Sequence, residues 1–358
     1  MTPARRRGLC AVLALLGSGA PWSGVRAQAD WRRNAVPVVT LQAWVDGLWR
    51  HHALPRALAF EAAARALQAR LQARADAGVD AAGAAGADPA RQAWRQALRT
   101  WAALGAVALG PLAARRSARR IDFAPTRPAL VLRALQRVAA GGAVPADEIG
   151  GPAKGLGALE WLLWSPEAPQ TPAARRYAVF AAADIAAEAQ ALVHAFGQGL
   201  PPAPDDRAAA AAEALNQWIG GLEALRLAGF EKPLADLRQR GPAALPRALS
   251  GAAALERQAR WHSLQALAVF APGAVPGAGL VPLETLLRGR GLNLLADRLV
   301  QAGAAAGAAV GAAGAPAGTG PAPLQRAARA LAALKHLAEA DLAPALDVAV
   351  GFSDADGD

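Results

Sequence analysis

The segment 154–164 places a single carboxylate, Glu160, inside an otherwise apolar run of helical length. An ionised glutamate in a dry interior is costly unless it is paired, hydrogen-bonded, bound to a metal or protonated. Glu160 is therefore expected either to belong to a ligand site or to serve the fold. In the second case its partner would be a buried arginine or a helix N-terminus.

A metal ion bound by Glu160 would need further ligands. Positions three apart on a helix share a face, so a His-x-x-Glu pair can present an imidazole and a carboxylate to one ion. Gly157 stands three residues before Glu160, and one carboxylate cannot hold a transition metal alone. We interpret Glu160 as the candidate metal ligand of an altered site, with a divalent cation as the ion.

Asp122 is the next candidate for ligand binding, because it lies in a tight turn between Ile121 and Phe123 with Pro125 following. The alternative is local, since an aspartate in such a turn commonly caps the backbone. The terminal residues Asp354, Asp356 and Asp358 alternate like the oxygen ligands of a calcium loop. No bidentate glutamate follows them, which favours a solvated acidic tail.

Catalytic signatures are missing from the sequence. His51 and His52 are adjacent and cannot chelate one ion from a regular helical turn. The other three histidines are isolated, and Ser263 beside His262 is no dyad because helical neighbours point apart. There is no His-Glu-x-x-His, no Gly-x-Ser-x-Gly and no phosphate-binding glycine loop. We expect no catalytic residue.

The N-terminus has the layout of a secretory signal peptide over residues 1–29, with three arginines, an apolar run and Ala27-Gln28-Ala29. The apolar run is too short to span a bilayer, and we predict no later transmembrane segment. A soluble periplasmic protein is expected. The net charge is +10, but the only dense basic cluster, 115–120, has no interleaved aromatic residues and is interpreted as a solvated helix end. Nucleic acid is not an expected partner.

Abundant alanine, few β-branched residues and recurring three- and four-residue apolar steps predict an all-α fold. The proline-rich segment 201–204 is the candidate linker between two helical bundles, 30–200 and 201–358. The Ala/Gly-rich stretches 77–87 and 302–323 are expected to be mobile inserts. Helices are predicted from Thr40 past Leu71 with a bend at Pro55, and over 88–109, 128–140, 156–164, 172–196, 206–227, 245–270, 283–300 and 324–348.

Several motifs in order resemble landmarks of the imelysin family. The segment 154–164 resembles its Gly-x-His-x-x-Glu signature, with Gly155 and Glu160 in place and Gly157 at the histidine position. Further similar segments are spread over nearly the whole mature chain. They are the helix around Trp94 with the Gly110-Pro111 pair at its end, the turn at 120–125, and the segments 175–178, 229–234 and 351–358.

The resemblance implies a periplasmic protein of two helical bundles associated with iron acquisition, and it makes Gly155 and Gly157 candidate ligand-binding positions beside Asp122. We expect an exported, non-catalytic binding protein in the uptake or handling of iron or another metal. Its partners would be a metal ion or metal complex and other periplasmic iron-uptake proteins. Two alternatives remain: a metal-dependent peptidase, as the family's label suggests, and a structural partner of another envelope protein.

Overall fold

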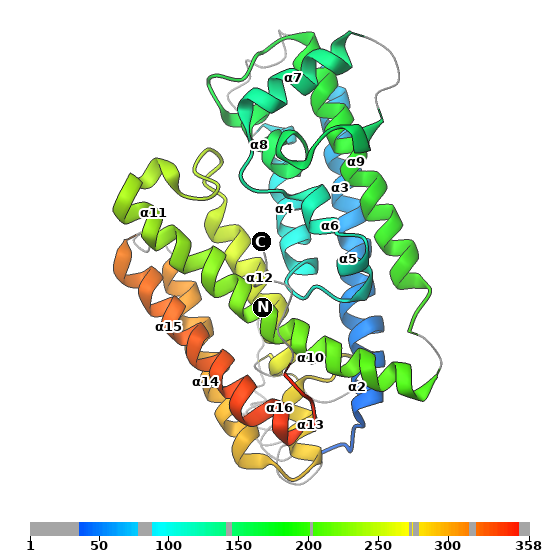
Figure 1. Ribbon diagram of the computed structural model, residues 1–358, viewed down its shortest axis with the longest axis vertical. Helices are drawn as coiled ribbons and strands as arrows, with labels where there is room; N and C mark the ends of the chain where they lie inside the picture. The colour runs from blue at the N-terminus through cyan, green and yellow to red at the C-terminus, as the bar shows by residue number, and fades with distance from the viewer. Residues whose placement is uncertain are drawn as a thin grey trace, which may run out of the picture.

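The computed structural model describes residues 36–77, 88–140, 145–200, 203–271, 274, 279–314 and 320–350. Every regular element in these ranges is a helix, which confirms the predicted all-α fold (Figure 1). The predicted signal peptide, Pro201 and Pro202, and the terminal aspartates lie outside the described residues.

The helices up to α9 lie on one side of the molecule, where α3 packs against both α4 and α9 (Figure 1). Two short helices, α5 and α6, lead into the segment that carries Asp122. The bounds in this half are α2 (Leu41–Leu48), α3 (Leu54–Asp76), α4 (Pro89–Leu104), α5 (Gly110–Ala114), α6 (Ser117–Ile121), α7 (Pro128–Ala139), α8 (Gly155–Trp164) and α9 (Pro172–Gly197).

Local signals in the sequence explain where two of these helices begin. The Thr40 hydroxyl accepts the Ala43 N–H at 3.1 Å and the Asp88 carboxylate accepts the Ala90 N–H at 2.9 Å, so these residues cap the helices that were predicted to begin at 40 and at 88. In place of the bend expected at Pro55, a π-helical turn, Trp49–Ala53, separates α2 from α3, and Pro55 lies in the first turn of α3.

The remaining helices form the other side of the molecule. A π-helical turn, Leu227–Glu231, joins α10 to α11, and a second one, Ala338–Leu342, follows α15. The bounds are α10 (Pro204–Arg226), α11 (Lys232–Arg240), α12 (Ala253–Ala268), α13 (Leu283–Gly289), α14 (Asn293–Gly314), α15 (Pro321–Leu337) and α16 (Ala343–Ala345).

The expectation of a mobile insert at 302–323 is wrong for residues 302–314, which belong to α14, and for residues 321–323, which begin α15. Their small side chains let α14 approach α12 closely. A Cβ added at Gly307 would lie 3.1 Å from Trp261 Nε1, and one at Gly314 would lie 2.5 Å from Gln258 Nε2. Alanine and glycine here allow close helix packing, although the same composition resembles that of a linker.

The predicted helix 245–270 is also too long, because α12 begins only at Ala253. Residues 245–252 form turns in which Arg247 and Gly251 have positive φ angles of 56° and 67°. Proline at 242 and 246 disfavours a regular helix here. This turn segment supplies two of the polar groups of the candidate site.

The two sides contact each other through α4 with α12 and α2 with α10. The boundary between two bundles near residue 200 stays a prediction, although α9 ends at Gly197 and α10 begins at Pro204. Of the described helices, α9 alone is long and apolar enough to cross a membrane by length and composition. It packs against α3, α7 and α8 and buries two ion-paired carboxylates, as the core helix of a folded protein does.

Candidate functional site

A cavity of about 630 Å³ lies where the two sides of the molecule meet. One part of its wall comes from Asp122 to Thr126 and from α8, including Gly157 and Glu160. The other part comes from the α10–α11 junction, the 244–249 turns and the first half of α12. The cavity thus brings together the predicted residues Asp122, Gly157 and Glu160, and it has the size of a small-molecule site.

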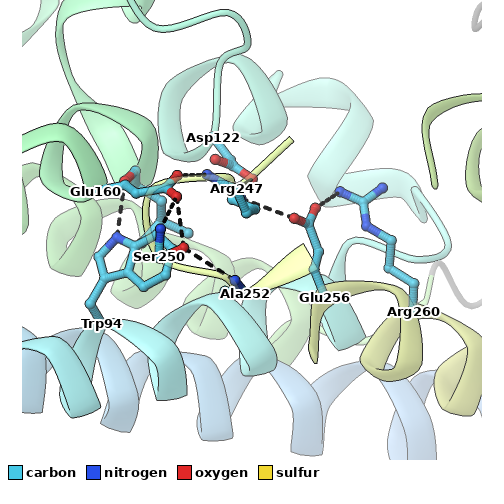
Figure 2. A network of polar contacts seen from close by, with 9 residues as sticks. Trp94, Asp122, Glu160, Arg247, Ser250, Ala252, Glu256 and Arg260 are labelled. Atoms are coloured by element: carbon cyan, nitrogen blue, oxygen red, sulfur yellow. Dashed lines mark hydrogen bonds and ion pairs between the residues drawn. The ribbon is translucent and has the colours of Figure 1, made fainter. Parts of the chain in front are cut away.

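Glu160 is 7% exposed, and both of its carboxylate oxygens are occupied by protein groups (Figure 2). Oε1 accepts the backbone N–H of Ser250 at 3.1 Å and its hydroxyl at 2.7 Å. Oε2 lies 3.2 Å from Arg247 Nη1. Both partners belong to the turn segment after α11, so Glu160 links α8 to the other side of the molecule.

Arg247 is the centre of the polar network in Figure 2. Its guanidinium, on a side chain only 10% exposed, pairs with three carboxylates: Glu160 through Nη1, Asp122 through Nη2 and Glu256 through Nε. Its Cζ also lies 5.6 Å from the centroid of the Trp94 ring. One cation therefore joins acidic groups from the α6 end, α8 and α12.

Helix α4 fixes the positions of α8 and of the turn that carries Ser250. Trp94 Nε1 donates to the Leu156 carbonyl at 2.9 Å, which fixes the first turn of α8. Arg95 Nη2 donates to the Ser250 carbonyl at 2.9 Å, which fixes the turn that binds Glu160. Consecutive residues of one helix thus position both partners of the Glu160–Ser250 contact.

The charges of the network are unequal, with three carboxylates and the guanidiniums of Arg247 and Arg260. Burial raises the pKa of Asp122, opposed by Arg247 and reinforced by the negative charge of Glu256. Burial also acts to raise the pKa of Glu256, but Arg260 and Arg247 outweigh it and lower that pKa. Burial would lower the pKa of Arg247, yet the carboxylates around it raise the pKa instead. Arg247 is therefore a permanent internal cation.

Gly155 holds the backbone of α8 against the end of α6. Its φ of +75° disfavours other residues, and an added Cβ would lie 2.4 Å from the Ile121 carbonyl oxygen. Gly155 itself lies outside the cavity lining. Its contact sets the position of Asp122, the next residue after Ile121, relative to Glu160.

A side chain at position 157 would meet the Thr126 hydroxyl. An added Cβ would lie 2.1 Å from the Thr126 hydroxyl oxygen, and Thr126 also lines the cavity. The imidazole of a His-x-x-Glu pair would need this space. Any residue larger than glycine at 157 would therefore require the Thr126 side chain to move.

The acidic residues near Glu160 do not fit a bare metal ion. Among the described residues, no group of three His, Cys, Asp or Glu side chains is arranged to hold one. The space between Asp122, Glu160 and Glu256 is filled by the Arg247 guanidinium. The geometry favours the structural alternative left open from the sequence, a buried arginine partner for Glu160.

A second buried network supports the α6–α8 region from α9. Asp184 pairs with Arg120 and with Lys154, the residue that precedes α8. Glu188 pairs with Arg115 and Arg120. The interpretation of the 115–120 cluster as a solvated helix end therefore fails for these two arginines, which neutralise buried carboxylates.

Histidines contribute no group to the cavity lining. His51, His194, His262 and His336 are exposed. His52 is buried, with its Nε2 lying 3.2 Å from Ser263 Oγ. Because the Ser263 hydroxyl donates to the Ala103 carbonyl at 2.6 Å, this pair is a structural link and no activated nucleophile.

Sequence reasoning missed most partners of the site: Arg247, Ser250, Glu256, Arg260 and Thr126. The first two were assigned to a regular helix, and the others carried no motif. The signal that could have found the turn is the pair of prolines at 242 and 246 beside glycines at 241 and 251.

Comparisons with known proteins agree on one family. The family model described as Imelysin matches residues 53–342. An imelysin-like protein from Psychrobacter arcticum has a similar structure, with a TM-score of 0.67, 18% identity, and coverage of 88% of this chain and 99% of that one. A structure from Parabacteroides distasonis named "putative iron-regulated protein A precursor" has a TM-score of 0.65, 15% identity, and coverage of 85% and 96%. No curated protein matches the chain.

At these identities the two structures show a common fold, and the family model spans most of the chain. The resemblance inferred from the order of the motifs is thereby confirmed. This protein belongs to the imelysin family.

Proposed function

We propose that this protein is an exported imelysin-like binding protein that acts in the uptake or handling of iron or another metal, without catalysing a reaction. The observation that carries the proposal is the cavity of about 630 Å³ whose wall contains the signature helix α8 and residues from both sides of the molecule. A cavity of this size and position is typical of small-molecule sites.

The arrangement of charges supports a metal complex as the cargo in preference to a bare ion. A bare cation placed beside Glu160 would have to displace the guanidinium of Arg247 and break its contacts with three carboxylates. A complex that brings its own ligands to the metal needs no such displacement. Delivery to or from other periplasmic iron-uptake proteins is part of the same proposal, as is export through the predicted signal peptide 1–29.

The name of the Parabacteroides relative, an iron-regulated protein, supports the choice of iron. The family's peptidase label is the competing suggestion. A metal-dependent peptidase needs an open metal position and an activated water, whereas the acidic groups of this cavity are paired with arginines. Zinc-dependent cleavage of casein that disappears in Glu160→Gln would overturn the non-catalytic proposal.

Elemental analysis of the purified mature protein, after exposure to iron salts and to iron chelates, tests the binding proposal. Ala248 is exposed and lines the cavity, so Ala248→Trp adds bulk there with little effect on the core. Ala62 on α3 is also exposed and does not line the cavity, which makes Ala62→Trp the matched control.

We expect near-stoichiometric metal in the wild type and in Ala62→Trp, and a strong loss in Ala248→Trp. Metal at background level in the wild type under every condition would contradict the proposed function. Equal retention by both tryptophan variants would move the site away from this cavity.

A further inference from the structure

The cations that line the cavity are not all balanced by its carboxylates. The lining contains four carboxylates, Asp122, Glu160, Asp236 and Glu256, and each of them pairs with a lining arginine. Those arginines are Arg240, Arg247 and Arg260. Within the described part of the chain, the lining residues Lys232 and Arg257 have no ion pair with a carboxylate.

Arg257 is held firmly but is incompletely satisfied. Its Nη2 donates to the Ala313 carbonyl at 3.3 Å, and its Cζ lies 5.4 Å from the centroid of the Phe230 ring. Its stem passes over Gly229, where an added Cβ would lie 3.5 Å from Arg257 Cδ. The Arg257 Nε is buried without a hydrogen-bond partner. Burial lowers the pKa of Arg257, and the negative charge of Glu256 on the same helix opposes this only in part.

A second donor of the same kind lies one helical turn away. Arg260 Nε is also buried without a hydrogen-bond partner, although Arg260 Nη2 binds Glu256 at 2.8 Å. Residues 257 and 260 share a face of α12 because they are three positions apart. Lys232, exposed at the start of α11, adds an ammonium to the same lining.

We propose that the cavity binds a small organic anion, with a carboxylate or phosphate group placed against Arg257 and Lys232. Guanidinium and ammonium groups without a counter-ion are the donors that such oxyanions use. Trp161, Leu225 and Leu245 in the same lining supply apolar surface for the organic part. This inference rests on the proposed function, because it names the charge class of the cargo: a metal would arrive as a chelate of this anion.

The test uses metal-free protein and measures binding of citrate, succinate and inorganic phosphate by isothermal titration calorimetry at constant ionic strength. Lys232→Gln removes an exposed cation of the lining and should fold normally, and Arg257→Gln removes the partly buried one. Arg326→Gln, which removes an exposed cation on α15 outside the lining, is the matched control.

We expect at least one carboxylate probe to bind the wild type and Arg326→Gln with equal affinity. Binding should weaken by about tenfold or more in Lys232→Gln and in Arg257→Gln, as expected for the loss of one charged hydrogen bond. Phosphate binding alone would identify a phosphorylated ligand as the source of the oxyanion. Equal affinities in all four proteins, or no binding of any anion, would overturn the inference.

The two proposals can fail separately. Retention of metal that is insensitive to Lys232→Gln and Arg257→Gln would leave the binding function standing and refute the anion. Anion binding that depends on these residues, in a protein that never retains metal, would refute the metal function and keep the anion site.

Discussion

Replacing Glu160 by glutamine removes one charge from the Arg247 network while keeping the side-chain shape. The amide oxygen can still accept from Ser250, but the charged contact with Arg247 Nη1 at 3.2 Å is lost. A hydrogen bond to a charged group contributes roughly 1.5–3 kcal/mol, and removing one partner of a buried pair costs about 3–5 kcal/mol when the other is left alone. Arg247 keeps Asp122 and Glu256, so we expect Glu160→Gln to lower the free energy of unfolding by about 2 kcal/mol.

Urea unfolding followed by far-ultraviolet circular dichroism measures this loss. Glu148→Gln is the control, because Glu148 pairs with Arg137 on the surface with side chains 52% and 50% exposed. Such a pair is worth about 0–1 kcal/mol. Arg247→Met should cost more than Glu160→Gln, about 3–5 kcal/mol, because three carboxylates lose their shared cation. A Glu160→Gln protein as stable as Glu148→Gln would contradict this prediction, and so would an Arg247→Met protein more stable than Glu160→Gln.

Two further predictions concern Gly157 and His52. Gly157→Ala and Gly157→His should both destabilise the protein without creating metal affinity, because Thr126 Oγ1 occupies the place of the added Cβ. Urea unfolding and metal titration measure the two effects. Adding Thr126→Ala to Gly157→Ala should restore most of the lost stability. Burial, with Arg56 nearby, holds the pKa of His52 well below its usual value of 6.5, so below about pH 6.5 the unfolded chain binds a proton that the folded protein does not. Stability should fall as the pH drops from there through the folded-state pKa, by up to about 1.4 kcal/mol per pH unit, and an identical pH profile in His52→Gln would contradict this assignment.

The helices were predictable because their signals are local. The helices predicted to begin at Thr40 and Asp88 do begin there, and each of these side chains caps its helix. The helical structure of residues 302–314 could not be predicted from local signals. Alanine and glycine are equally compatible with a linker and with a closely packed helix, and only the approach of Trp261 and Gln258 distinguishes the two.

The candidate site was predictable only in part. The apolar surroundings of Glu160 indicated a buried carboxylate with a partner, and its 7% exposure agrees. The identity of that partner depends on a contact between residues 87 positions apart in the chain. Arg247 carries no local signature in a chain rich in arginine, and its placement needs the turn that replaces the predicted helix 245–270.

In the proposed site Arg247 takes the place of a cation beside Glu160, and cargo metal lies elsewhere in the cavity as an anionic complex. Anomalous diffraction at the iron absorption edge, from crystals grown with an iron chelate, tests it most directly. We expect an iron peak inside the cavity near Arg257 and Lys232, with the Arg247–Glu160 contact intact. Iron bound between Glu160 and Asp122 with Arg247 displaced would contradict it, as would a cavity without iron.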